Sequence, residues 1–363
     1  MTYDKITIEL TNYKKEFWNL MMKGTKGNYE NLKGGKISNE MFVLPYDSNK
    51  KYNELINDEC VFRRIATNIK ANDSDHTLFV SDSDDVAEWN LTNIEDIKNV
   101  ITNFTKKRME CHTLSIITRL DEDIVHDSQF DTEDYLIKHF AKSFGKAEEN
   151  AFINGTGVNM PIGILNGTDG AEVGVTTNEI TFDDVIALYF SLKSEYRTKG
   201  SWLINDEIAK NLYTLKDADG NYIWNHNSNT IMGRPVYTTN AMPSTGKAIA
   251  FGDFSYYWIT IRMPISARSI NELFCGNQQV GYLAKEYLDG ILIRTDAIKV
   301  LQLNYEELLM DTLAKETVLQ IDDTVFIIEY ETSKSSTETA YDKVKKLILN
   351  HVKDKENINQ LSA

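Results

Sequence analysis

The sequence is short of cysteine and histidine, and both shortages exclude classes of protein. The three cysteines, Cys60, Cys111 and Cys275, are widely separated and form no C-x-x-C pair. A disulfide framework is therefore excluded, and we expect buried or free thiols in a reducing compartment. The six histidines show no H-E-x-x-H or other ligand spacing. Since zinc sites need such spacings, no metal ligands are predicted.

Long apolar runs and positive charge are also scarce. No run approaches the roughly 20 apolar residues of a membrane helix, and the N-terminal sequence MTYDKITIEL is no signal peptide. Lys and Arg number 39 against 54 Asp and Glu, which gives a formal net charge of -15. Because phosphate neutralisation needs clustered basic residues, tight nucleic-acid binding is not expected. The cluster Lys106-Lys107-Arg108 is interpreted as a solvated strand end.

No motif in the chain predicts catalysis or a cofactor. Gly155-x-Gly157 follows a predicted helix rather than a strand, and it lacks the third glycine of a dinucleotide loop. The turn KDADGNY would need calcium ligands at Leu215 and His226, which cannot supply them. Cys111 and His112 are adjacent on a predicted strand, so they point to opposite faces. We therefore predict no catalytic, cofactor-binding or metal-binding residues.

The strongest positive feature is the stretch from Asp131 to Gly163. Asp131 is a good N-cap, and apolar residues then recur every three or four positions, which predicts a helix over about 131–154. Glycines end the helix and keep the following chain irregular. The apolar stripe consists of Leu136, Phe140, Phe144, Ala147 and Ala151, and the glycines Gly155, Gly157 and Gly163 are predicted to form a structural hinge.

Upstream of this helix the pattern is strand-like, with a polar interruption. Strands are predicted over 61–70, 76–80 and 107–120, and the polar stretch 81–105 between them favours a long projecting hairpin. Residues 1–58 resemble an extended arm with a short helix that carries Tyr13, Phe17, Leu20 and Met21. Because this arm has no evident core of its own, it is either frayed or laid on another subunit.

Downstream, helices and strands follow without regular alternation. Thr181 and Asp184 have capping-box spacing ahead of a helix that extends to Tyr196, and Asn205 caps a helix to about Leu215. Strands are predicted over 202–204, 231–239, 248–251, 256–262, 290–294, 297–303 and 324–330, and a last helical stripe over 341–352. The fold class is therefore mixed α+β and not a doubly wound sheet.

Six segments together resemble one family. They are HDSQFDTED, EENAFINGTGVNMPIGILN, GSWLIND, LKDADGNYIW, IMGRPVYTTNAMP and AIAFGDFSYYWITIR. Their order and spacing are similar to those of the major capsid protein of tailed bacteriophages, which has the Hong Kong 97-type (HK97-like) fold.

The resemblance implies a domain map. It places an N-arm at 1–58 and a peripheral domain at 59–163 and 263–313. The peripheral domain would include an extended E-loop at about 76–112 and the spine helix at about 131–154. An axial domain would cover 164–262, and 314–363 would be a C-terminal appendage outside the common core.

The resemblance also implies a function. The chain would be a structural protein, not an enzyme, that self-assembles into hexamers and pentamers of an icosahedral shell. The shell would enclose double-stranded DNA without sequence-specific binding. The implied location is the virion, with assembly in the host cytoplasm, and portal, scaffolding and decoration proteins are implied as further partners.

Two features of the chain differ from the pattern of the family, and two alternative functions stay open. The long helical scaffolding region of many members is not found ahead of the first strand. Crosslinking of an E-loop lysine (Lys98, Lys106 or Lys107) to Asn271 of a neighbour is not predicted from so common a residue pair. One alternative is an encapsulin-like compartment that loads protein cargo. The other, an enzyme that binds a small molecule at the 155–163 loop, is disfavoured by the missing ligands.

Overall fold

The computed structural model describes most of the first 304 residues and two strands beyond them. The described ranges are 11–23, 29–37, 41–70, 75–81, 104–127, 129–216, 220–222, 224–225, 228–304, 316–321 and 324–329. The chain divides into two units, Met1–Leu303 and Asn304–Ala363, which are considered separately. None of the described helices is long and apolar enough to span a bilayer.

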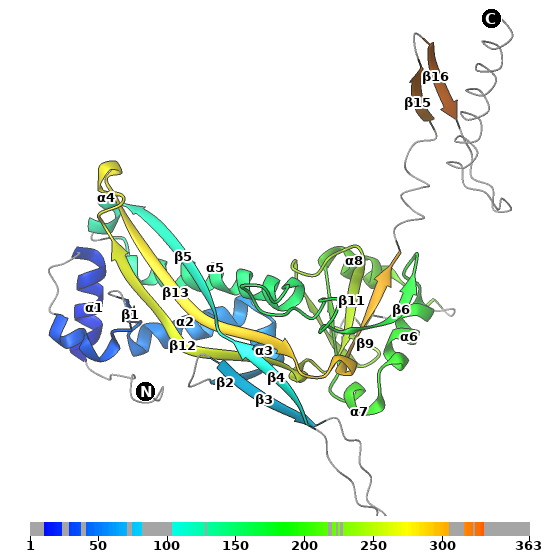
Figure 1. Ribbon diagram of the computed structural model, residues 1–363, viewed down its shortest axis with the longest axis horizontal. Coiled ribbons are helices and arrows are strands. Elements are labelled where there is room, and N and C mark those ends of the chain that lie inside the picture. Colours follow the sequence, from blue (N-terminus) through cyan, green and yellow to red (C-terminus); the bar gives the residue numbers. More distant parts are fainter. Residues whose placement is uncertain are drawn as a thin grey trace, which may run out of the picture. The chain divides into compact units, whose positions relative to one another are not determined.

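A five-stranded sheet forms the first half of the larger unit. Strands β12 (Tyr257–Ile270) and β13 (Gln279–Leu292) make a long antiparallel hairpin, and β13 also pairs with β5 (His112–Asp121). The short strands β1 (Phe42–Val43) and β2 (Thr67–Lys70) both pair with β12, antiparallel and parallel respectively. The sheet therefore joins segments that are far apart in the sequence (Figure 1).

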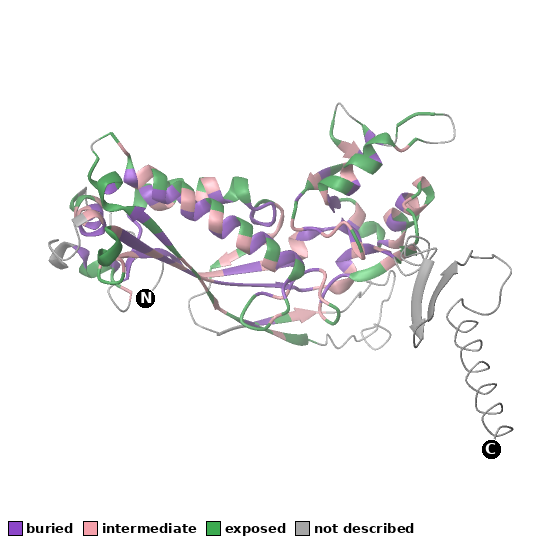
Figure 2. Cartoon of the chain, turned by 90° about the horizontal axis from the view of Figure 1, so that it is seen from above, coloured by how far each residue is buried: buried purple, intermediate pink, exposed green. Residues whose placement is uncertain are grey.

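The predicted long helix is confirmed as α5 (Thr132–Asn154), and α2 (Tyr46–Glu59) packs along it. The Asp131 side chain caps α5 by accepting a hydrogen bond from the Asp134 backbone N–H at 2.9 Å. The buried face of α5 is turned to the sheet (Figure 2). Leu136, Phe140 and Phe144 are buried as predicted, whereas Ala147 and Ala151 are only half-buried. A spacing of four residues exceeds the 3.6 residues of a helical turn, so the buried face shifts slowly around the helix. Glu148 and Phe152 are therefore the buried residues toward its C-terminal end.

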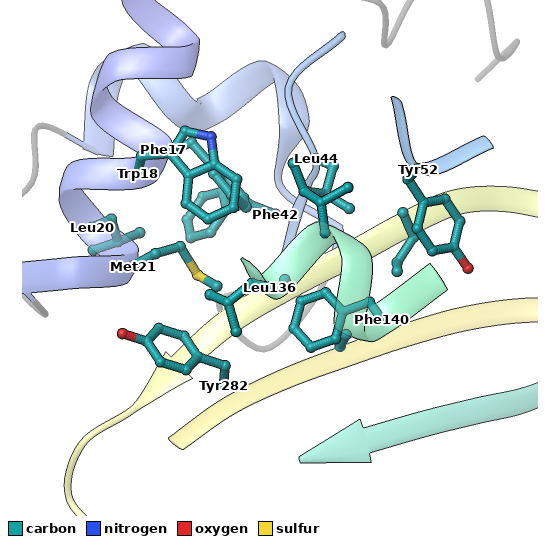
Figure 3. Close-up of a cluster of buried hydrophobic side chains, with 14 of the residues drawn as sticks. Phe17, Trp18, Leu20, Met21, Phe42, Leu44, Tyr52, Leu136, Phe140 and Tyr282 are labelled. Atoms are coloured by element: carbon teal, nitrogen blue, oxygen red, sulfur yellow. The ribbon is translucent and has the colours of Figure 1, made fainter. Parts of the chain in front are cut away.

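The aromatic residues of the first described helix are buried within this same chain. Tyr13, Phe17 and Met21 lie on α1 (Thr11–Lys23), as predicted, and join the cluster that contains Phe140 and Tyr282 (Figure 3). Helix α1 is followed by a 3-10 helix, Tyr29–Gly35. The expectation that these aromatics need another subunit for burial is therefore wrong for the described part of 1–58.

The predicted strand over 61–70 is only half correct. The structure has a helical turn, α3 (Phe62–Ile65), before the short strand β2. Phe62 and Arg63 are both buried, with exposed fractions of 0% and 7%. A strand would send these neighbours to opposite faces, whereas a helical turn separates them by about 100° and lets both reach the interior.

The projecting hairpin is confirmed. Strands β3 (Asp75–Ser81) and β4 (Phe104–Glu110) pair antiparallel up to Ser81 and Phe104, and 82–103 lies outside the described residues. A break at Cys111 divides the predicted strand 107–120 into β4 and β5. The short helix α4 (Glu122–His126) follows β5.

A seven-stranded sheet forms the second half of the larger unit, in the order β6-β14-β11-β7-β10-β9-β8. Thr181 and Asp184 make the predicted capping box, and the Asn205 side chain caps as predicted. The helix after Thr181 ends at Ser191 rather than at Tyr196. The elements are β6 (Glu172–Thr177), α6 (Phe182–Ser191), α7 (Ser194–Arg197), β7 (Ser201–Ile204), α8 (Asp206–Thr214), β8 (Trp224–Asn225), β9 (Thr230–Ile231), β10 (Arg234–Thr238), β11 (Lys247–Gly252) and β14 (Ile298–Leu303).

The predicted domain boundaries stay predictions; one strand crosses a boundary, and another pairs with strands on the far side of one. Strand β12 begins before residue 262, and β14 pairs with β6 and β11 although 263–313 was assigned to the peripheral domain. In the second unit, β15 (Glu316–Ile321) pairs antiparallel with β16 (Thr324–Glu329), which confirms the predicted strand there. The predicted helix over 341–352 lies outside the described residues.

Candidate functional site

The three predicted hinge glycines lie together in a tight loop after α5. The Gly163 N–H donates to the Gly155 carbonyl at 2.9 Å, and Thr156 bridges to Ile162. Gly157 has a φ of +82°, whereas Gly155 has a φ of -61°. At Gly155 a Cβ would stand 2.1 Å from the Pro161 carbonyl oxygen, so close backbone approach requires glycine there. The hinge role of the three residues stays a prediction.

A cavity of about 280 Å³ lies between this loop, α5 and strands β5 and β13. Its lining is largely apolar, with Leu114, Leu288 and Met160 beside the half-buried alanines of α5. His112 and Glu148 are its titratable lining residues. Both carboxylate oxygens of Glu148 accept hydrogen bonds from one arginine, at 2.7 and 2.6 Å. Since that carboxylate is fully engaged, the described lining offers no acid–base pair for catalysis.

The arginine belongs to a buried charge cluster that joins four elements. Arg63 of α3 bonds Glu148 of α5 and also Glu286 of β13, the latter at 2.8 Å. Tyr52 of α2 donates to the other oxygen of Glu286 at 2.7 Å. Burial raises the pKa of Glu148 to about 7, with Glu286 adding to the rise and Arg63 opposing it. The cluster thus ties both helices to the sheet.

A second buried carboxylate fixes the base of the hairpin. Asp289 of β13 accepts hydrogen bonds from the backbone N–H groups of Glu110 and Gly290, each at 2.7 Å. His112 Nε2 lies 3.7 Å from Asp289 Oδ1. Burial raises the pKa of Asp289 to about 7. On the hairpin itself, Lys107 pairs with Asp169 at 3.1 Å.

The raised pKa of Asp289 makes stability depend on pH. Its folded pKa of about 7 is above the ordinary value of 3.8, so the folded state holds a proton that the unfolded state has released. The stabilisation is full below the unfolded pKa and is lost as pH rises through about 7, at about 1.4 kcal/mol per pH unit at most. We expect the melting temperature to fall between pH 5 and pH 8, and to fall less in Asp289→Asn. Calorimetry with the exposed Asp123→Asn as control measures this, and equal slopes in all three proteins would contradict it.

The described residues contain no group of three or more His, Cys, Asp or Glu side chains placed to hold a metal ion. Of the lysines considered for crosslinking, Lys107 pairs with Asp169 and Lys106 lies over the Phe79 ring at 5.8 Å, while Lys98 lies outside the described residues. Sequence reasoning missed the buried charge cluster. One signal was available, because Glu148 stands four residues from both Phe144 and Phe152 on the apolar face of a helix.

Comparison with known proteins gives a consistent result. The model of the phage capsid family matches residues 40–303. The capsid of an empty GTA particle is 27% identical, with a TM-score of 0.59 over 68% of this chain and 90% of that chain. The capsid of a native GTA particle is 24% identical, with a TM-score of 0.57 over 77% and 99%. A structure from Microbacterium phage Oxtober96 has a TM-score of 0.52 at 15% identity, over 68% and 91%. No curated protein matches.

These matches confirm the predicted Hong Kong 97-type fold and the predicted role as a major capsid protein of a tailed phage. They do not favour the encapsulin-like alternative. The matched family and structures are capsid proteins, which are structural. The family model spans both sheets, the long helix and the hairpin. This chain belongs to the phage capsid family.

Proposed function

We propose that the chain builds the icosahedral head of a tailed phage or prophage as hexamers and pentamers. The observation that carries this is the likeness of its sheet-and-helix unit to almost the whole length of a capsid chain. The shell encloses double-stranded DNA without sequence-specific binding, which suits a net charge of -15. The role is structural rather than enzymatic. Subunits assemble in the host cytoplasm and end in the virion.

The hairpin supports an assembly role because it exposes aromatic rings. Phe79 and Phe104 are 63% and 60% exposed. Phe79 is paired with Lys106 and Phe104 with Ser81, so the two rings lie two positions apart on the same hairpin face. Adjacent exposed aromatics indicate burial against another molecule. Portal, scaffolding and decoration proteins are proposed as further partners.

Negative-stain electron microscopy tests the proposal directly. The full chain is expressed alone and together with its neighbouring genes, and closed shells of uniform diameter are expected in at least one preparation. Folded subunits that form no shell in either preparation would contradict the proposed function.

We also propose that the glycine loop sets the geometry between the two sheets. Gly157→Ala should lower the free energy of unfolding by about 1–2 kcal/mol, because alanine is strained at a positive φ. Shell yield should fall with it. Gly167→Ala is the matched control, since a Cβ there meets nothing within 4 Å. Urea unfolding and shell yield are compared, and a Gly157→Ala protein equal to the control would refute the role of the loop.

A further inference from the structure

The cavity beside the glycine loop arises because the packing of α5 against the sheet changes along the helix. In the middle of α5, the rings of Phe140 and Phe144 are buried against sheet residues such as Tyr282. One and two turns later, Ala147 and Ala151 line the cavity and are only half-buried. Because alanine carries a single methyl group, the space that phenyl rings fill earlier in the helix is left open at this end.

The other apolar lining residues come from the sheet and from the loop. Leu114 of β5 and Leu288 of β13 belong to the sheet, and Met160 and Pro161 to the loop. Water in such a cavity has few hydrogen-bonding partners, so an apolar group displaces it favourably. A cavity of about 150 Å³ with an aliphatic lining holds a benzene ring. The 280 Å³ found in this protein is therefore enough for two fused rings.

An aromatic ligand suits this lining better than a branched aliphatic one. The same helix already packs flat rings against the same sheet at Phe140 and Phe144. The thioether of Met160, at the loop side of the cavity, makes favourable contacts with aromatic rings and adapts its shape to them.

His112 gives the cavity an unused hydrogen-bonding group. Its Nε2 lies 3.7 Å from Asp289 Oδ1, which is too far for a hydrogen bond, and its imidazole forms none with the described residues. Burial lowers the pKa of His112, with Glu110 opposing the shift, so the ring is neutral at pH 7.5. A neutral imidazole has one acceptor nitrogen, which can take a proton donor of a ligand.

The other titratable lining group excludes charged ligands. Glu148 is 1% exposed, and both of its carboxylate oxygens accept hydrogen bonds from Arg63, so it is not available to a cation. An anion would lie near that carboxylate, and the described lining contains no lysine or arginine to balance it. The ligand that fits is therefore neutral.

We propose that the cavity beside the glycine loop binds a small neutral molecule with two fused aromatic rings and one N–H or O–H donor, such as an indole. Its rings lie between the alanines of α5 and the leucines of the sheet, and its donor bonds to His112. The inference goes beyond the proposed function, because it adds a ligand site to a structural protein and involves no catalysis. Since the molecule contacts α5, the loop and two strands at once, it should stabilise the subunit.

Titration of the full chain with indole tests the site. Ligand-observed NMR at pH 7.5 should show a dissociation constant below about 1 mM. At ten times that constant, the melting temperature should rise by about 2 °C. Benzofuran has nearly the same shape without the N–H donor, and it should bind about fivefold more weakly. A dissociation constant for indole above about 1 mM would overturn the proposal.

Filling the cavity from α5 locates the binding site. Ala151→Leu should weaken indole binding more than about tenfold, because the larger side chain and the ligand compete for the same space. Ala187→Leu adds the same atoms at an exposed position of α6 and is the matched control, with unchanged affinity expected. If Ala151→Leu does not fold, Ala147→Leu takes its place. Equal affinity in the filled and control variants would mean that indole binds elsewhere, and would refute the site.

His112→Leu tests the partner of the ligand's donor. The substitution keeps a bulky side chain in the lining and removes the acceptor nitrogen. This variant should bind indole and benzofuran with similar affinity, whereas the unaltered chain prefers indole. A preference for indole that survives in the variant, or that is missing in the unaltered chain, would overturn the hydrogen bond assigned to His112. Thermal unfolding checks that every variant is folded.

Discussion

Replacing Arg63 by methionine should lower the free energy of unfolding by about 3–5 kcal/mol. Its guanidinium is the cation that bonds both Glu148 and Glu286, and all three side chains are at most 5% exposed. Removing it leaves two carboxylates buried at close range without their counter-charge. Urea unfolding of the soluble subunit at pH 7.5 measures the loss. The neighbouring Arg64 is exposed, so Arg64→Met is the control and should change stability by less than about 0.5 kcal/mol.

The Arg63 variant should also respond to acid in a characteristic way. The pKa of Glu148 is already raised to about 7 with the arginine present, and losing the cation raises it further. Part of the lost stability should therefore return as the pH is lowered from 7.5 to 5.5. A variant that is as stable as the Arg64 control at pH 7.5 would show that the cluster does not depend on its cation.

Phe62→Ala should lower the free energy of unfolding by a similar amount, about 3–5 kcal/mol, because packing around the ring is lost. The Phe62 ring is fully buried and lies 5.1 Å from Tyr257, 5.8 Å from Phe254 and 5.9 Å from Phe152, measured between ring centroids. Those contacts join the turn before β2 to the start of β12 and the end of α5. A cavity there weakens the packing between these elements.

The exposed Phe190, at 60%, provides the matched truncation. Phe190→Ala removes the same atoms from the surface and should change stability by less than about 1 kcal/mol. Thermal unfolding of both variants at one pH compares them. Similar melting temperatures for the two variants would mean that the ring cluster around Phe62 repacks without loss of stability, and would contradict the prediction.

The sequence correctly predicted the elements that are specified by residues close together in the chain. The long helix was found because Asp131 and three apolar residues at helical spacing lie within fifteen positions, and the capping box at Thr181 needs only four. The hairpin was found because two strands flank a polar stretch. The family resemblance then supplied the order of the parts.

Tertiary interactions decided the elements that were missed. Strand β12 continues through Pro264, and its register with β13 shifts twice between Ile261 and Ser266, so alternation in the sequence is lost there. The turn at Phe62 and Arg63 is stabilised by partners on α5 and β13, more than 80 residues away. The aromatics of α1 looked unsupported because the residues that cover them come much later in the chain. No local pattern carries that information.

The order of the strands has a consequence for synthesis on the ribosome. Among the strands that the structure describes, β5 pairs with β13 alone, and the hydrogen bond between Asp121 and Gln279 spans 158 residues. At about 5–20 residues per second, a ribosome needs roughly 10–30 s to make the intervening chain. During that interval the apolar residues of β5 and α5 have no sheet to cover them. Many chains made side by side expose the same strands at once, so ribosome-bound chaperones, or faster translation between 121 and 279, should raise the soluble yield.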